Sequence, residues 1–354
     1  MTLGIVDVGT NSIHLLIGIL GLNGKFHVVL KERDLTRLGE GGLADGRLTH
    51  AAMNRAMSVL RRYAATLTRC RVDHIEAVAT SAVREAKNGP AFIRRVRARL
   101  GLPLRMINGR EEARLIYLGV VQAHQLHRSI VIITIGGGSA QVIYGNGAHL
   151  RYAVSLPLGG ARLAQRFLHH DPPRLDELEA LKGYTHRAWA PVARALHRHR
   201  WQMALGSSAT ISQLMMAAYR RIHRRSPARK QPLRMSRRAL HELVQWLSTS
   251  TTTERVRLEG IDPRREDLLL PTAVALLTWM ERCGVSQLRH APGSLREGLV
   301  IDYLLRHVRR GSPKIEPPLA DLLGVNGGGD FSLPGKNRWR RQLLHHLQAS
   351  EHQA

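Results

Sequence analysis

Two glycine-rich turns, each preceded by a short apolar run, are the segments of this sequence best suited to hold phosphate. Residues 7–12 read Asp-Val-Gly-Thr-Asn-Ser, and residues 136–139 read Gly-Gly-Gly-Ser. Glycine lets backbone N–H groups approach phosphate oxygens closely. A tight hairpin explains the second turn equally well when that turn is taken alone. Together, the two turns predict a clamp that holds a phosphoryl group from two sides during nucleophilic attack.

The two turns belong to an internal repeat. Residues 7–18 align with residues 134–145 at an offset of 127 positions. The agreeing pairs are Gly9 with Gly136, Ser12 with Ser139, Gly18 with Gly145, Val8 with Ile135, Leu15 with Val142 and Leu16 with Ile143. A repeated strand–turn–strand unit predicts two similar halves that face each other.

The elements around the repeat predict a mixed α/β fold. Apolar runs of strand length alternate with helical periodicity up to residue 159, and the chain beyond is mainly helical. We expect strands at 3–8, 14–20, 26–30, 75–79, 104–108, 129–135, 140–144, 203–205 and 287–290, and helices at 49–69, 90–100, 110–123, 161–168, 175–199, 207–223, 237–247, 264–282 and 295–308. This pattern predicts a first half at 1–123, a second half at 124–309, and a linker with a basic tail at 310–354.

The charge of the chain favours a polyanionic partner. Lys and Arg number 53 against 27 Asp and Glu, so the formal net charge is +26. Such a field attracts polyphosphate, nucleic acid or an anionic membrane, although a general preference of the source organism for arginine would also produce it. Cys70 and Cys283 form no metal-binding or disulfide pattern. No signal peptide or apolar run of membrane-spanning length is present, so we expect a cytoplasmic protein without a membrane partner.

Half of the net charge lies in one segment. Residues 183–241 contain 13 Lys and Arg and no Asp or Glu: Arg187, Arg194, Arg198, Arg200, Arg220, Arg221, Arg224, Arg225, Arg229, Lys230, Arg234, Arg237 and Arg238. A solvated helix face usually mixes signs. We therefore expect residues 220–238 to line the path of a long polyphosphate chain toward the turn at 207–210, the alternative being a solvated basic loop.

Further motifs give the sequence a family resemblance. It resembles the exopolyphosphatase and guanosine pentaphosphate phosphohydrolase family over about residues 3–305. The matching segments are 7–16, 38–43 (LGEGGL), 79–86 (ATSAVREA), 109–120 (GREEARLIYLGV), 135–139 (IGGGS), 155–162 (SLPLGGAR), 206–210 (GSSAT) and 260–271. The resemblance implies two domains of the acetate kinase, Hsp70 and actin type, which is related to ribonuclease H. It also implies a short family member that lacks the helical HD-like domain.

The resemblance assigns a role to each matching residue. Glu112 would orient or deprotonate the attacking water, Asp7 would hold Mg²⁺, and Arg84 would contact phosphate. Without the resemblance, Glu112 would be read as a surface carboxylate paired with Arg110 or Arg114, and Asp7 as a turn cap. The residues expected to donate hydrogen bonds to phosphate are Thr10, Asn11, Ser12, Gly137, Gly138 and Ser139, joined by Ser207, Ser208 and Thr210, which open a helix and would alternatively cap it.

Two positions depart from the family pattern. Thr134 stands where the family has Asp, and Gln141 stands where it has Glu, so the second turn lacks two negative charges. Carboxylates bind Mg²⁺ better than hydroxyls or amides do. We therefore expect a weakly held metal ion and weakened catalysis, while the retained Glu112, Asp7 and Arg84 argue against complete loss of activity.

The sequence leaves four possible functions open. An exopolyphosphatase that releases orthophosphate from the chain end is the leading one, and conversion of pppGpp to ppGpp is the second. A weakly active or non-catalytic regulator that binds polyphosphate or nucleotide is a third, because of Thr134 and Gln141. A nucleic-acid-binding module comes last, since no recognised motif is present and aromatic residues make up 5% of the chain. A homodimer is left open.

Overall fold

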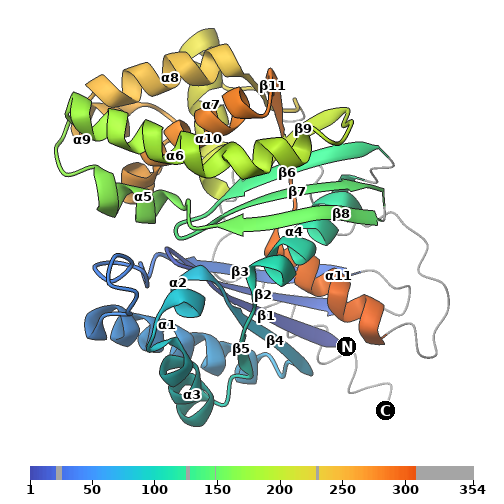
Figure 1. Cartoon of the computed structure of the whole chain (residues 1–354). Coiled ribbons are helices and arrows are strands. Elements are labelled where there is room, and N and C mark those ends of the chain that lie inside the picture. The colour runs from blue at the N-terminus through green and yellow to red at the C-terminus, as the bar shows by residue number, and fades with distance from the viewer. Residues whose placement is uncertain (21–25, 125–127, 148, 229–230, 308–354) are drawn as a thin grey trace.

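The first half is built on a five-stranded mixed sheet (Figure 1). A computed structural model describes residues 1–20, 26–124, 128–147, 149–228 and 231–307. The strands lie in the order β3 (Phe26–Asp34), β2 (Ile13–Leu20), β1 (Thr2–Val8), β4 (His74–Ala79) and β5 (Leu104–Met106). The first three are antiparallel, and β4 and β5 run parallel to β1. Helices α1 (His50–Arg69), α2 (Ser81–Glu85) and α3 (Gly89–Leu100) complete this half.

The second half is built on a six-stranded mixed sheet with helices on its outer face (Figure 1). Its strand order is β10 (Arg234–Ser236), β11 (Gln287–His290), β9 (Met203–Gly206), β6 (Ser129–Ile135), β7 (Ala140–Asn146) and β8 (His149–Leu156). The helices are α5 (Gly160–Phe167), α6 (Leu175–Leu196), α7 (Ala209–His223), α8 (Arg237–Thr249), α9 (Thr252–Arg257) and α10 (Leu269–Arg282), with a 3₁₀ helix η1 (Pro263–Leu268). Within the described ranges, no helix is long and apolar enough to cross a bilayer.

Two further helices lie between the sheets. They are α4 (Gly109–His124) and α11 (Leu295–His307), which pack on each other, and α11 also packs on β1 (Figure 1). Their buried side chains join residues of both sheets, such as Ile5 and Ile132, in one apolar cluster. A Cβ added at Gly119 would lie 2.3 Å from the carbonyl oxygen of Ser294, and one at Gly298 would lie 1.8 Å from that of Leu115. Only glycine permits so close a crossing.

The two turns of the internal repeat have the same local structure. The amide of Gly9 donates to the carbonyl of Ser12 over 3.0 Å, and the amide of Gly136 donates to that of Ser139 over 2.9 Å. Each turn joins two antiparallel strands in equivalent register, so that Asp7 lies opposite His14 and Thr134 lies opposite Gln141. The expectation of two similar halves is therefore confirmed.

Most predicted elements are present. Thr49 caps α1 by accepting a hydrogen bond from the amide of Ala52, and Gly101 ends α3 with φ of 65°. The sequence reading missed β8, β10, α2 and α9, and it merged η1 with α10 into one helix. The predicted linker and tail at 310–354 lie outside the described residues.

Candidate active site

The two glycine-rich turns lie against each other between the halves. A Cβ added at Gly137 would lie 3.1 Å from Cβ of Asn11, and one at Gly138 would lie 2.4 Å from the hydroxyl oxygen of Thr10 and 2.6 Å from that of Ser81. Side chains at these two glycines would therefore push the turns apart. The structure thus brings together the turn residues that the sequence assigned to phosphate.

The first turn presents an unused donor. The side-chain nitrogen of Asn11 is buried, and it has no hydrogen-bond partner within the part of the chain that the structure describes. Backbone bonds fix the turn, since the amides of Arg37 and Gly39 donate to the carbonyls of Asn11 and Thr10 over 3.0 and 2.9 Å. A buried amide without a partner is costly unless a ligand or water accepts its hydrogen bond. Asn11 is therefore suited to donate to a phosphate oxygen.

Glu112 lies in the first turn of α4 and is buried. Its Oε2 atom accepts a hydrogen bond from Nη1 of Arg84 over 2.8 Å, and the same nitrogen donates to the carbonyl of Ile107 over 3.1 Å. The alternative of a surface carboxylate paired with a neighbouring arginine is wrong, because Arg114 pairs instead with Asp302 at 2.8 Å. Glu112 and Arg84, which are 28 residues apart in sequence, thus form one partly buried ion pair.

Both predicted acidic residues have raised pKa values. Burial raises the pKa of Glu112 to about 7, an effect that Arg84 opposes and that the charges of Asp7 and Glu85 reinforce. Burial also raises the pKa of Asp7 to about 6, while Arg296 lowers it and Glu297 raises it. A carboxylate with a pKa near neutrality can accept a proton from water more readily than an ordinary glutamate can. Glu112 therefore has the properties of a general base.

The second turn contains an uncharged hydrogen-bond network. Thr134 donates to Oε1 of Gln141 over 2.7 Å, and Nε2 of Gln141 donates to the hydroxyls of Ser139 and Ser155 over 2.9 and 3.0 Å. No group of three or more His, Cys, Asp or Glu residues is arranged to hold a metal ion in the described ranges. Mg²⁺ is usually bound by one or two carboxylates together with substrate phosphates. Asp7 fits such a site, while Thr134 and Gln141 offer only neutral oxygens that already bind each other.

The three hydroxyls at the start of α7 are engaged in internal hydrogen bonds. Ser208 caps α7 by accepting from the amide of Ile211 over 3.1 Å, as the capping alternative predicted. Ser207 donates to the carbonyl of Gly293 over 2.6 Å, and Thr210 accepts from Nη2 of Arg265 over 2.9 Å. Their contact with phosphate stays a prediction.

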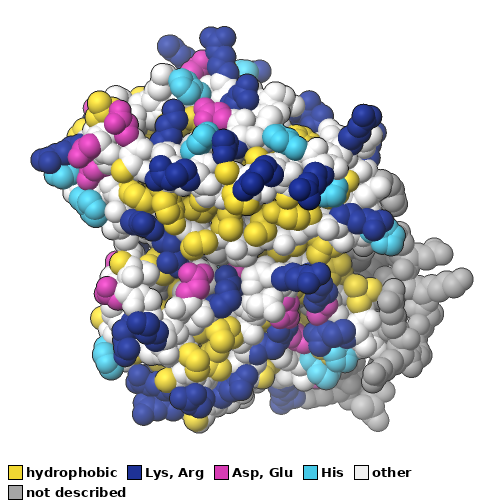
Figure 2. Space-filling view, in the orientation of Figure 1, with side chains coloured by type: hydrophobic (Ala, Val, Ile, Leu, Met, Phe, Trp, Pro, Cys, Tyr) yellow, Lys and Arg dark blue, Asp and Glu magenta, His cyan; other side chains and the backbone are white. Residues whose placement is uncertain are grey.

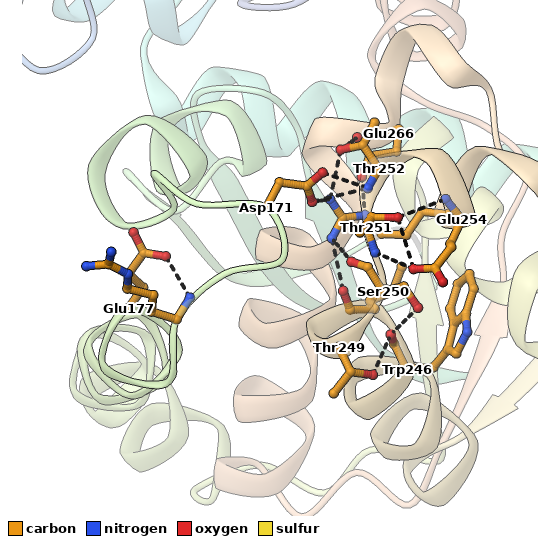
Figure 3. A network of polar contacts seen from close by, with 12 residues as sticks. Asp171, Glu177, Trp246, Thr249, Ser250, Thr251, Thr252, Glu254 and Glu266 are labelled. Atoms are coloured by element: carbon orange, nitrogen blue, oxygen red, sulfur yellow. Dashed lines mark hydrogen bonds and ion pairs between the residues drawn. The ribbon is translucent and has the colours of Figure 1, made fainter.

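A polar network that includes Glu266 of η1 connects this helix to Thr252 of α9 and to Asp171 (Figure 3). Arg255 forms ion pairs with Glu266 and with Asp171, the latter at 2.7 Å, and donates to the carbonyls of Leu247 and Ser250. The network therefore joins α8, α9, η1 and the segment after α5. Burial lowers the pKa of Arg265 to about 10. Arg265 is thereby held in place at the start of α7.

The sequence reading missed two residues near Asp7, His14 and Arg296. Nη1 of Arg296 lies 2.9 Å from Nδ1 of His14, and burial together with Arg296, Arg33 and Arg265 lowers the pKa of His14 well below its usual value. His14 is therefore neutral, and Nδ1 accepts the hydrogen bond. The strand pattern carried a signal for His14, because residues 7 and 14 flank a turn and so lie opposite each other. The sequence carried no such signal for Arg296. This residue lies 282 positions after His14 and reaches it only because α11 packs on β1.

Comparisons with known proteins identify the family to which this chain belongs. The chain belongs to the Ppx/GppA phosphatase family, whose model matches residues 21–307. Exopolyphosphatase 1 of Mycobacterium bovis is 28% identical over 306 residues, which are 86% of this chain and 88% of that protein.

Solved structures agree with this assignment. An exopolyphosphatase from Cytophaga hutchinsonii has a TM-score of 0.79 and 29% identity, and the match covers 86% of this chain and 98% of the other. A Ppx/GppA family member from Aquifex aeolicus has a TM-score of 0.71 and 25% identity, with 88% and 99% covered. The expectation of an α/β protein with two halves, each built on a mixed sheet, is confirmed.

Proposed function

We propose that this protein is an exopolyphosphatase that removes the terminal phosphate of inorganic polyphosphate as orthophosphate. The observation that carries the proposal is the partly buried Glu112–Arg84 ion pair beside two touching glycine-rich turns. The choice of polyphosphate is supported by the charge, since Figure 2 shows Lys and Arg over both halves of the visible face. A long polyanion benefits from such an extended field more than a compact nucleotide does. We place the activity in the cytoplasm.

In the proposed mechanism, the terminal phosphoryl group lies between the two turns. The side chains of Thr10, Asn11, Ser12 and Ser139 and the amides of Gly137 and Gly138 donate to its oxygens. Arg84 turns part of its guanidinium group toward the phosphate and keeps Glu112 in place. Glu112 accepts a proton from the attacking water, and the leaving chain carries away the developing negative charge. A Mg²⁺ ion held by Asp7 and substrate oxygens would neutralise charge on the phosphates.

The neutral network in the second turn favours one other function. With Thr134 and Gln141 bound to each other, the protein would hold polyphosphate or a guanosine polyphosphate and hydrolyse it slowly or not at all. Such a protein would act as a regulator that binds the polyanion.

A phosphate-release assay separates these functions. Long-chain polyphosphate and pppGpp are each incubated with the protein, with and without Mg²⁺, beside Glu112→Gln. An exopolyphosphatase releases orthophosphate from long chains faster than from pppGpp, and Glu112→Gln abolishes the release. Equal or greater turnover of pppGpp would contradict the polyphosphate assignment, and binding of polyphosphate without release would support the regulator.

A further inference from the structure

Arg162 connects the second glycine-rich turn to the first half of the molecule. It lies in the first turn of α5, where its backbone amide donates to the carbonyl of Gly137 over 3.1 Å. Its Nε donates to the carbonyl of Gly138 over 3.0 Å, and Nη1 donates to that of Leu43 over 3.4 Å. Nη2 forms an ion pair with Glu85. One guanidinium group therefore contacts three segments that meet between the halves.

Glu85 receives this contact on the same short helix that carries Arg84. Its second carboxylate oxygen accepts a hydrogen bond from the hydroxyl of Ser81 over 2.6 Å and lies 3.8 Å from Nη2 of Arg84. Arg84 in turn holds Glu112 at 2.8 Å. The side chains thus form a chain of alternating charge, Arg162–Glu85–Arg84–Glu112, which begins on the second half and ends at the general base.

The charges in this series of four side chains indicate that Glu85 has a role beyond packing. Glu85 is an acid beside a site that must bind a polyanion, so its charge opposes substrate binding. The side chain of Glu85 is 34% exposed, and an ion pair of this kind contributes little to stability on its own. What Glu85 does supply is a fixed anchor for two arginines that would otherwise repel each other. That role matters for the orientation of Arg84.

We propose that Glu85 is a positioning residue: it holds Arg84 of the first half in register with Arg162 of the second half, so that Arg84 meets the phosphate when the two turns are closed around it. The proposal rests on the proposed hydrolase function. It names no new contact with substrate, because Glu85 acts through the two arginines.

The proposal makes a prediction for kinetics that a folding defect does not share. Glu85→Gln should lower kcat by about 10–100-fold, the scale of a misplaced catalytic group, while KM stays unchanged or falls because a negative charge is removed. Arg162→Gln should lower kcat similarly, and the double variant should lose no more than the larger single loss, since both act through one contact. Glu85→Asp, which keeps the charge, should recover part of the loss.

The matched control is Glu111→Gln. Glu111 is a neighbouring acid in α4 with similar exposure, and it pairs with Arg105 at 2.7 Å without touching Arg84. Its kcat should stay within about twofold of the starting protein. A Glu85→Gln variant that behaves like this control, or additive losses in the double variant, would overturn the proposal.

Two further measurements keep the outcome clear. If Glu85→Gln does not fold, Arg162→Lys is measured in its place. Lysine keeps the positive charge but lacks the guanidinium fork that reaches three partners. Unchanged kcat in Arg162→Lys would also overturn the proposal. Direct titration with long-chain polyphosphate gives a readout besides turnover, and its affinity should not weaken in Glu85→Gln. Absence of phosphate release from the unaltered protein would instead refute the proposed function.

Discussion

Thr134 donates a 2.7 Å hydrogen bond to Gln141 at the positions where the first half has Asp7 and His14. The two pairs are related by the internal repeat, so they lie at the bases of the two facing turns. One pair includes the acid Asp7, and the other is neutral. This difference makes the second turn the place to test whether a metal ion binds between the two turns.

Thr134→Asp should lower the Mg²⁺ concentration that gives half-maximal activity, because it adds a hard anionic ligand near Asp7. Gln141→Glu should act in the same direction, and the two changes should be non-additive because both act through one ion. The measurement is a Mg²⁺ titration of phosphate release. Thr134→Asn serves as the neutral control. Identical Mg²⁺ titration curves for the Thr134→Asp and Thr134→Asn variants would show that position 134 does not contact the metal ion.

Glu112→Gln should lower phosphate release by about 10²–10⁴-fold, the usual contribution of a general base. The amide keeps the size of the side chain and can still accept a hydrogen bond from Arg84, so polyphosphate binding should be retained. Steady-state kinetics and a binding titration measure the two effects. Near-normal turnover in this variant, with Glu111→Gln as control, would exclude Glu112 as the base.

The pH dependence of kcat/KM should follow Glu112. Its pKa is raised to about 7, so the base is protonated below that pH and kcat/KM should rise as the pH increases through 7. Arg84 lowers this pKa, so Arg84→Gln should move the rising limb to higher pH in addition to lowering the rate. A limb that stays in place or moves to lower pH would show that another group controls it.

Arg224 and Arg225 test the expected polyphosphate path. Both are exposed after the end of α7, which is about 22 Å long at 1.5 Å per residue and begins at the Ser208 cap. Reversal of both to Glu should weaken long-chain polyphosphate and flatten its salt dependence, by analogy with counterion release from nucleic acids. Hydrolysis of pppGpp should change much less.

The control for that reversal carries the same change in net charge. Arg94 and Arg99 are exposed on α3 in the first half, so their reversal to Glu alters the overall field without touching the tract. Equal salt slopes for the two double variants would assign the effect to net charge. An unchanged slope in the Arg224 and Arg225 variant would identify the tract as a solvated basic loop.

The fold was predictable where local patterns decide it. The repeat of residues 7–18 at 134–145 predicted two equivalent turns, and their hydrogen bonds agree. Strand β8 was missed although Leu150, Tyr152, Val154 and Leu156 alternate along it and Asn146 with Gly147 precedes it, a sequence typical of a hairpin turn. The short α2 and β10 have too few residues for a clear period.

The site was predictable only in part. Glu112 and Arg84 came from the resemblance, and only the structure showed that they pair with each other. Arg162 matched a family segment, but its contacts with Leu43 and Glu85 join positions that are 119 and 77 residues away. Arg296 reaches His14 across 282 residues. Such contacts depend on the packing of whole elements, which no local pattern in one sequence reports.

The glycine crossing of α4 and α11 links the two sheets, because α4 packs on β8 and α11 packs on β1. At Gly119 and Gly298 the two helix backbones approach so closely that any larger side chain would separate them. Glu112 lies on α4, the same helix as Gly119, whereas the glycine-rich turns connect strands of the two sheets. The position of Glu112 is therefore set by the helix pair between the sheets, and a larger side chain at Gly119 or Gly298 would displace it relative to both turns.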